Sequence, residues 1–327
     1  MKNNTIRMRR LREKKFLRLM LSETNFTLDD LIYPLFVTHG RGLRREINTM
    51  PGIHHISLDN LISEIDEIAR LKIKSVILFG IPEKKSEQGI EAYDSGGIIQ
   101  ESIRVIKQAI PDIVIITDVC LCQYTTHAHC GLINNNAIDN DSTLDVLGKI
   151  AVSQAEAGAD IIAPSAMMDM QVSSIRDSLD KEGFKDTPIM SYSAKYSSAF
   201  YGPFRVAVDS SPQFGDRDSY QINPRNIKEA MREIDQDIKE GSDIIMVKPA
   251  MSYLDIISLA NRKFNHPLAA FNTSGEYAMV KSASQNGWID EKRTVLEIIT
   301  SIKRAGADMI ISYHAKDIAS WLNNDLD

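Results

Sequence analysis

Residues Asp243–Ala250 read DIIMVKPA, and this short stretch carries the signal that decides the fold. Four consecutive apolar residues, Ile244–Val247, predict a strand that is buried on both faces. Lys248 stands at the end of that strand, and Pro249 stops it. A lysine there must reach water or lose its proton readily, because burial disfavours the charged form of an amine. Taken alone, the position fits a lysine that snorkels to the surface as well as it fits a reactive one.

The same junction occurs three times in the chain. The three copies are EAGADIIAPS at 156–165, KEGSDIIMVKP at 239–249 and RAGADMIISYH at 304–314. Each has a glycine suited to ending a helix, then an aspartate, then an apolar strand. The repetition indicates one supersecondary unit that is used again and again.

Apolar runs predict eight strands, and helical spacing predicts a helix after nearly every one. The strands are expected at 31–37, 75–81, 113–121, 160–165, 188–195, 244–248, 267–273 and 308–313. The helices are expected at 56–71, 96–109, 143–157, 170–182, 223–240 (with Pro224 in its first turn), 253–263, 277–285 and 290–305, with a short last one to 322.

This alternation predicts a parallel sheet in the α/β class. Eight units in about 290 residues fit a closed (β/α)8 TIM barrel better than an open sheet. An open doubly wound sheet would need a glycine-rich phosphate turn after the first strand. The chain offers only HGRG at 39–42, which is not the GxGxxG fingerprint.

Composition excludes several classes of protein. The formal net charge of −6 argues against a dedicated nucleic-acid binder. No apolar run approaches the roughly 20 residues that span a bilayer, and the N-terminus lacks the apolar core of a secretory signal. All three cysteines lie within 120–130, which is no disulfide framework. We therefore expect a cytoplasmic protein with no nucleic-acid or membrane partner.

The first segment is strongly basic. Residues 1–18 hold eight lysines and arginines against one acid, Glu13. We interpret 1–30 as an N-terminal arm outside the core that contacts partner chains, and 31–327 as the catalytic barrel. An RNA-binding tail, which would bind polynucleotide in a salt-sensitive way, and a transit peptide are the alternatives.

Polar or reactive residues end six of the eight predicted strands. In a TIM barrel the active site lies at this end of the strands. The residues expected at this rim are Asp118, Cys120, Cys122, Ser165, Lys195, Lys248, Ser274, Tyr313 and His314.

Lys195 and Lys248 end neighbouring strands. Adjacent strands are about 4.8 Å apart, so two amines there would each favour deprotonation of the other. A neutral lysine is a nucleophile toward ketones and forms a Schiff base. The alternative is a pair of lysines in ion pairs with carboxylates such as Asp118.

The segment DVCLCQYTTHAHCG, at 118–131, predicts a metal site. Cys120 and Cys122 can share one ion, and the loop returns Cys130 to it. Three thiolates suit zinc and leave one coordination position open for water or substrate. A fourth ligand from His127 or His129 would instead make a closed structural site.

The segment from about 197 to 221 is too long for an ordinary loop and is rich in aromatic residues. These properties favour an ordered active-site lid. Arg205 and Arg217 on it can clamp a carboxylate through paired hydrogen bonds. Ser274 and Tyr313, from the opposite side of the rim, could hold a second carboxylate.

The chain resembles the porphobilinogen synthase (δ-aminolevulinate dehydratase) family over nearly its whole length. The matching stretches are DDLIYPLFV, MPGIHHISLDNL, DVCLCQYTTHAHCG, SYSAKYSSAFYGPFR, PQFGDRDSYQ, DIIMVKPAMSYLDII and NTSGEYAMVK. The resemblance implies a lyase that condenses two molecules of 5-aminolevulinate into porphobilinogen, with loss of two waters, in tetrapyrrole (heme) biosynthesis.

The resemblance also implies roles for the rim residues. Lys248 and Lys195 each hold one substrate ketone, on the propionate (P) and acetate (A) sides respectively. The A-side carboxylate is gripped by Arg205 and Arg217, and the P-side carboxylate by Ser274 and Tyr313. Asp118 and Ser165 are also expected to contact substrate.

The metals and the assembly follow from the same resemblance. Cys120, Cys122 and Cys130 match the catalytic zinc ligands of the zinc-dependent branch. Glu233 matches the ligand of an allosteric magnesium; otherwise it is a solvated helix residue. The arm would wrap a neighbouring subunit of a homo-octamer.

Three positions depart from the family pattern. Ala128 replaces a glycine in the cysteine loop, Val206 replaces a charged residue of the lid, and His314 stands where an apolar or aromatic residue is usual. None removes a proposed chemical group, but they bear on lid motion and zinc affinity.

A Schiff-base aldolase on the same barrel, with the cysteines as a structural zinc site, is the second enzyme hypothesis. It predicts that borohydride traps a single lysine and that a chelator leaves activity intact.

Overall fold

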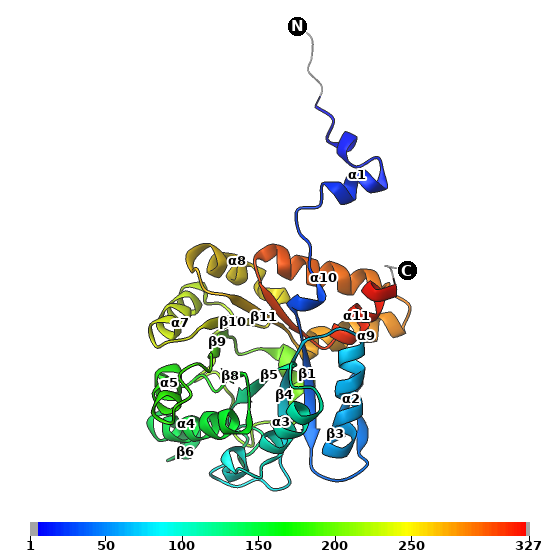
Figure 1. The fold of residues 1–327 in the computed structure, drawn as a ribbon. Helices are drawn as coiled ribbons and strands as arrows, with labels where there is room; N and C mark the ends of the chain where they lie inside the picture. The colour runs from blue at the N-terminus through cyan, green and yellow to red at the C-terminus, as the bar shows by residue number, and fades with distance from the viewer. Residues whose placement is uncertain (1–5, 325–327) are drawn as a thin grey trace.

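The computed structural model describes residues 6–324, and its centre is a barrel of eight parallel strands (Figure 1). Their order around the barrel is β8-β5-β4-β1-β12-β11-β10-β9. A parallel bridge between Ile162 and Ile189 joins the two ends of this order. The strands are β1 (Leu31–Thr38), β4 (Ser75–Ile81), β5 (Val114–Val119), β8 (Ile161–Pro164), β9 (Met190–Lys195), β10 (Ile244–Lys248), β11 (Leu268–Asn272) and β12 (Met309–Ser312). The predicted TIM barrel is confirmed.

Helices surround the barrel, as the apolar spacing predicts. They are α2 (Leu58–Arg70), α3 (Ile98–Ala109), α4 (Asn140–Ala157), α5 (Gln171–Lys181), α7 (Ile227–Lys239), α8 (Leu254–Lys263), α9 (Ser274–Gln285), α10 (Glu291–Ala305) and α11 (Ala315–Asn324). In the part of the chain that the structure describes, no helix is long and apolar enough to cross a membrane.

The expected starts of three helices were wrong: α4 begins at Asn140 and α9 at Ser274, each three residues before the expected start, and α7 begins late. We expected Pro224 inside the first turn of a helix from 223, but α7 begins at Ile227. The Asn223 side chain accepts a hydrogen bond from the Arg225 N–H, which makes a local turn, and Asn226 is extended. Asparagine competes with helix formation in this way, so the turn delays the helix.

Several short elements were not predicted. The strands β2 (Arg44–Ile47) and β3 (Met50–Ser57) form a hairpin outside the ring of eight strands. It is attached to the barrel because β3 also pairs with the end of β1. A second hairpin joins β6 (Leu132–Asn134) to β7 (Ala137–Asp139), and its turn uses Asn135 and Asn136 with positive φ. The Asn-Asn pair was a usable signal, because asparagine tolerates that conformation.

The N-terminal arm projects away from the barrel (Figure 1). Its helix α1 (Lys15–Met20) leaves Phe16 81% and Met20 74% exposed. Large apolar side chains are seldom so fully exposed together unless another surface covers them.

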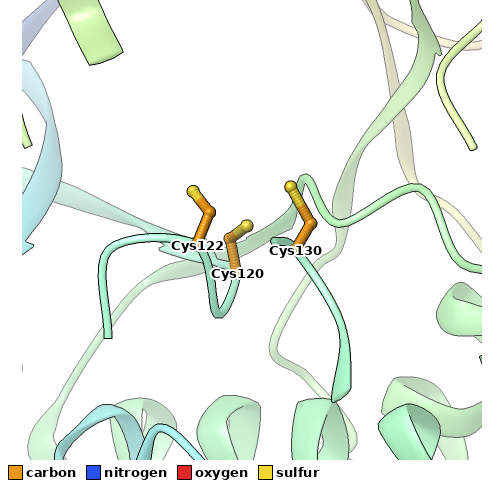
Figure 2. A group of neighbouring side chains, drawn as sticks. All are labelled: Cys120, Cys122 and Cys130. Carbon is orange, nitrogen blue, oxygen red and sulfur yellow. The ribbon is translucent and has the colours of Figure 1, made fainter. Parts of the chain in front are cut away.

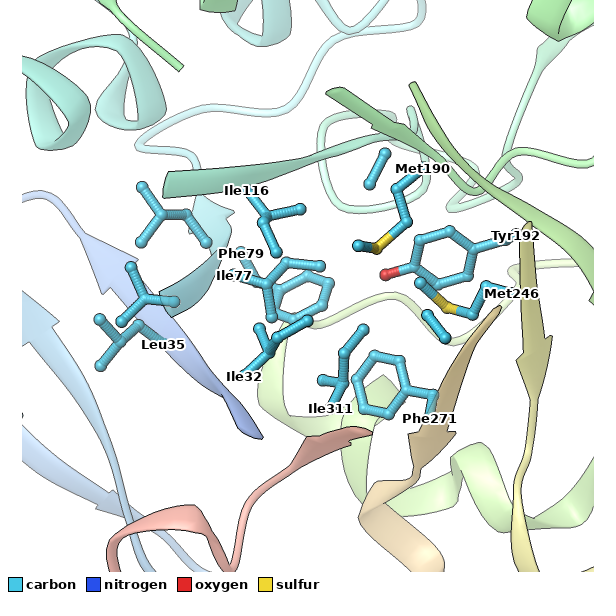
Figure 3. Close-up of a cluster of buried hydrophobic side chains, with 14 of the residues drawn as sticks. Ile32, Leu35, Ile77, Phe79, Ile116, Met190, Tyr192, Met246, Phe271 and Ile311 are labelled. Atoms are coloured by element: carbon cyan, nitrogen blue, oxygen red, sulfur yellow. The ribbon is translucent and has the colours of Figure 1, made fainter. Parts of the chain in front are cut away.

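Side chains fill the interior of the barrel (Figure 3). Ile32, Ile77, Ile116, Met190 and Met246, from five different strands, are at most 2% exposed. Burial of each contributes about 1.5–3 kcal/mol, so the barrel is a packed core and its chemistry is confined to the rim.

The repeated junction is a structural device at the opposite end of the barrel. Gly158, Gly241 and Gly306 all have positive φ, between 103° and 120°, which other residues adopt at a cost. Each following aspartate accepts a hydrogen bond from a backbone N–H at the start of the preceding strand. The pairs are Asp160 with Ile115 (2.7 Å), Asp243 with Ile189 (2.8 Å) and Asp308 with Leu268 (2.8 Å).

We predict that Asp160→Ala lowers the free energy of unfolding by about 2 kcal/mol, because the Ile115 N–H loses a charged acceptor. Asp160 also pairs with Lys107 at 2.7 Å. Urea unfolding measures the change, with Asp112→Ala on an exposed loop as the matched control. Equal stability of the two variants would show that water replaces the carboxylate.

Candidate active site

Two buried lysines face each other where β9 and β10 end. Lys195 and Lys248 are partners in the strand register, and each is 6% exposed. The Lys195 ammonium donates a hydrogen bond to the carbonyl of Ser165. Among the described residues neither lysine forms an ion pair with a carboxylate. The alternative of two ion-paired lysines therefore does not match the structure.

Aromatic rings enclose the Lys248 amine. Its Nζ lies 3.9 Å from the ring centre of Phe271, 5.0 Å from that of Tyr192 and 5.2 Å from that of Phe204. Tyr192 also faces Lys195, at 5.6 Å. Sequence reasoning missed this enclosure. Only Tyr192 gave a signal, because it stands three positions before Lys195 at the end of β9.

This environment lowers the pKa of Lys248 to about 7. Burial is the main cause, and the nearby positive charge of Lys195 acts in the same direction. Asp118 and the thiols Cys122 and Cys120 oppose the shift. Near neutral pH a large share of Lys248 is thus an uncharged amine that can attack a carbonyl carbon.

Asp118 and Ser165 lie beside the lysines, as expected for rim residues. Both are buried, at 6% and 4% exposure. Burial raises the pKa of Asp118, while the charge of Lys195 and a hydrogen bond from Ser165 lower it. A carboxyl group with such opposing influences is suited to exchanging a proton.

The three cysteines form a cluster just beyond β5 (Figure 2). The sulfur atoms of Cys120, Cys122 and Cys130 all lie within 4.8 Å of one another, and all three residues are buried. Neither histidine joins this cluster within the described chain. His129 instead contacts the segment predicted to be the lid, with ring nitrogens 3.1 Å from the Tyr220 hydroxyl and 3.0 Å from the Phe214 carbonyl.

The cysteine cluster concentrates negative charge on one sulfur. Hydrogen bonds from Cys120 and Cys122, together with the charge of Arg217, lower the pKa of Cys130 well below its usual value. A hydrogen bond with Cys120 lowers the pKa of Cys122, but the contact with Cys130 and burial outweigh it and raise that pKa to about 11. Three close sulfurs that already stabilise a thiolate fit a soft divalent metal ion.

Arg205 and Arg217, the two arginines of the predicted lid, lie together. Arg217 is 4% exposed and donates to the carbonyls of Ala128 (2.9 Å) and Ser210 (2.6 Å). Arg205, on α6 (Gly202–Ala207), is half-buried, and burial and the charge of Arg217 lower its pKa. The Nε atoms of both are buried without a partner among the described residues. Both line a cavity of about 270 Å³, which suits a carboxylate ligand.

Ala128 has a positive φ of 59°, the conformation that a glycine would adopt more readily. Its backbone carbonyl accepts the hydrogen bond from Arg217, so residue 128 links the cysteine loop to the predicted lid segment. The expectation of a stiffened loop stays a prediction.

Ser274 and Tyr313 lie on the other side of the rim and are almost fully buried. The Ser274 hydroxyl donates to the Phe200 carbonyl and accepts from the Phe204 N–H, so it holds the lid backbone. The Tyr313 hydroxyl has no hydrogen-bond partner in the described part of the chain.

Glu233 is not near the lysines. It lines a separate cavity of about 410 Å³, together with Glu229, Asp169 and Asp237. Burial and the charges of Asp169 and Glu229 raise the pKa of Glu233. An acidic cavity of this kind suits a hard cation bound by oxygen ligands.

A closed parallel barrel with two facing lysines and a thiol cluster at its rim defines an enzyme that acts on carbonyl compounds. Comparison with known proteins makes this class specific. The family model described as "Delta-aminolevulinic acid dehydratase" matches residues 5–321.

Relatives of the same description cover almost the full length. The chain is 55% identical to one from Bacillus subtilis, over 97% of this chain and 98% of the relative. It is 54% identical to one from Archaeoglobus fulgidus, over 97% and 98%. A solved structure of the enzyme from Toxoplasma gondii, in complex with the reaction product porphobilinogen, superposes with a TM-score of 0.96. That structure is 42% identical, and the match covers 98% of this chain and 92% of that one.

The chain belongs to the delta-aminolevulinic acid dehydratase family, whose members are lyases also called porphobilinogen synthases. The fold and the activity predicted from the sequence are confirmed at this level.

We predict that trapping of a ketone on Lys248 by borohydride rises with pH, reaches half its maximum at about pH 7 and levels off about one pH unit above that. Below its pKa of about 7 the amine is protonated and inert; above it the amine is neutral. Mass spectrometry of labelled peptides measures the profile, and exposed lysines, with usual pKa values near 10.4, provide the internal comparison.

Lys195→Met tests the cause of the shift. Removing the neighbouring charge should move the Lys248 profile to higher pH. An unchanged midpoint would mean that burial alone depresses the pKa.

Proposed function

We propose that the chain condenses two molecules of 5-aminolevulinate into porphobilinogen, with release of two waters, through Schiff bases on Lys195 and Lys248. The observation that carries this mechanism is the register pairing of the two buried lysines beside the lowered pKa of Lys248. A single reactive lysine would serve one ketone, whereas two facing lysines can hold two.

Each lysine acts first as a nucleophile. The neutral amine attacks the ketone carbon, and a new carbon–nitrogen bond forms. The oxygen of the ketone leaves as water with the help of a proton, for which the buried Asp118 carboxyl is suited. Lys248 takes the P-side substrate and Lys195 the A-side substrate. Because both Schiff-base lysines lie at one buried rim, the two substrates are held close together for bond formation.

The substrate carboxylates bind on opposite sides of this rim. Arg205 and Arg217 take the A-side carboxylate, which is supported by their unpaired Nε atoms and the cavity that they share. Tyr313 takes the P-side carboxylate with its unpaired hydroxyl. Ser274 joins it if the hydroxyl exchanges a lid contact for the substrate. Residues 197–221 then act as the lid over both substrates.

Cys120, Cys122 and Cys130 would hold a catalytic zinc. The sulfur donor set supports this choice, because magnesium prefers oxygen ligands. These three residues would leave the bound ion accessible to water or substrate, and the ion would supply Lewis-acid polarisation there. The contacts of His129 with the lid support an open site over a closed one.

Glu233 would hold an allosteric magnesium in its acidic cavity, outside the lysine rim. Magnesium activation that is lost in Glu233→Gln would support this role, and activation that persists would refute it.

The basic arm would pack on a neighbouring subunit of a cytoplasmic homo-octamer. The exposed Phe16 and Met20 of α1 support this packing. Light scattering of a chain that begins at Leu31 should then show smaller particles than the full chain.

We predict that purified protein forms a pyrrole from 5-aminolevulinate when zinc and a thiol reductant are present. Lys248→Ala should lower the rate by about 10⁴-fold, since removing a covalent nucleophile eliminates its step. Lys195→Ala should be severely impaired as well, and exposed Lys185→Ala should retain the parent rate. A near-normal rate in Lys248→Ala would refute the mechanism.

Removal of the metal gives a further prediction. A chelator should abolish turnover, zinc should restore it, and magnesium alone should not, because the three ligands are sulfur. Cys122→Ser should bind zinc more weakly and require more of it for activity. Full pyrrole-forming activity after chelation would instead mean that a metal at the cysteines is not catalytic.

A further inference from the structure

A second group of metal-ligating side chains lies apart from the cysteine cluster. Glu291 is the first residue of α10, His314 precedes α11, and Asp317 is in the first turn of α11. Their ligand atoms all lie within 4.8 Å of one another. We call Glu291, His314 and Asp317 the peripheral cluster.

The His314 ring is buried without a polar partner. His314 is 1% exposed, and neither ring nitrogen has a hydrogen-bond partner among the described residues. Its Nδ1 is 3.7 Å from the Asp317 carboxylate, which is too long for a hydrogen bond. The ring packs against Tyr277, with centres 4.4 Å apart. An unpaired buried imidazole costs stability, so its position calls for a ligand.

The ammonium group of Lys281 lies between the two carboxylates of the peripheral cluster. The Lys281 ammonium donates to Glu291 at 2.5 Å and to Asp317 at 2.8 Å. It therefore lies between the two carboxylates, where a metal ion would bind them. The side chains of Glu291 and Asp317 are 27% and 37% exposed, which leaves a route from solvent.

We propose that the peripheral cluster binds a divalent transition-metal ion, which replaces the Lys281 ammonium. The two carboxylates neutralise the ion, the imidazole supplies the third ligand, and Lys281 turns to solvent. One nitrogen and two oxygen ligands suit zinc, cobalt or manganese, and water completes the coordination. The ligand atoms must draw in to roughly 3.4 Å from one another, as metal–ligand bonds of about 2.1 Å require.

The ion would tie the starts of α10 and α11 to the end of β12. Its binding is independent of the proposed condensation, since its measurement needs no substrate. It is also distinct from the cysteine cluster and from the cavity of Glu233, which contain none of these residues.

The test uses cobalt(II) added to full-length protein whose cysteine cluster has first been filled with zinc. Crystals grown with cobalt should show an anomalous peak among Glu291, His314 and Asp317. In solution, calorimetry should show an additional bound equivalent. Cobalt that exchanged into the cysteine cluster would give a strong thiolate-to-metal absorption band. Absorption spectra therefore distinguish the two sites.

Two variants sharpen the result. His314→Phe should weaken cobalt binding at this position at least tenfold, while an unchanged melting temperature without metal shows that it folds. Lys281→Met should strengthen binding, because the competing ammonium is gone. No anomalous peak in the parent, or equal binding by His314→Phe, would overturn the proposal. Binding by Lys281→Met alone would overturn it too, because Lys281 would then be the permanent occupant.

Discussion

The register pairing of Lys195 with Lys248 is the constraint on which the proposed chemistry depends. Pairing in adjacent strands holds the two backbones side by side, and both side chains are buried at the same rim, so the charge of Lys195 stays near Lys248. Burial is the main cause that lowers the pKa of Lys248 to about 7, and the charge of Lys195 adds to it. A flexible loop could relax the same repulsion by rotating one side chain away. The rigid barrel therefore converts an unfavourable charge pair into a nucleophile near neutral pH.

The barrel tolerates the unfavourable burial of two lysines because its stabilising contacts lie elsewhere, at the opposite end and in the interior. At the end opposite the lysines, Asp160, Asp243 and Asp308 fasten neighbouring strands through their carboxylates. Between the two ends, apolar layers fill the interior. Stability thus comes from the base and the core, and the rim is left to hold groups that would be unfavourable elsewhere.

The sequence was informative wherever a structure depends on neighbours along the chain. Strands, most helices and the strand-end lysines follow from apolar runs and glycine stops, and they agree with the structure. The enclosure of Lys248 by Phe271 and Phe204 was not predictable in this way, because those rings come from distant segments. The same holds for Ser274, whose hydroxyl holds lid backbone seventy residues away in sequence. Pro224 misled because a local asparagine turn competed with the helix signal.

Unpaired buried polar atoms at the rim indicate where a ligand would complete the structure. The Tyr313 hydroxyl and the Nε atoms of Arg205 and Arg217 lack partners among the described residues. Such groups cost free energy unless something pairs with them, so a protein keeps them where a bound molecule supplies the partner. The arginine pair and Tyr313 are the groups proposed to take two carboxylates. Binding of two acidic substrates would therefore supply hydrogen-bond partners to groups that are already desolvated in the free protein. In the same step, Ser274 would exchange its contact with the lid backbone for a contact with substrate.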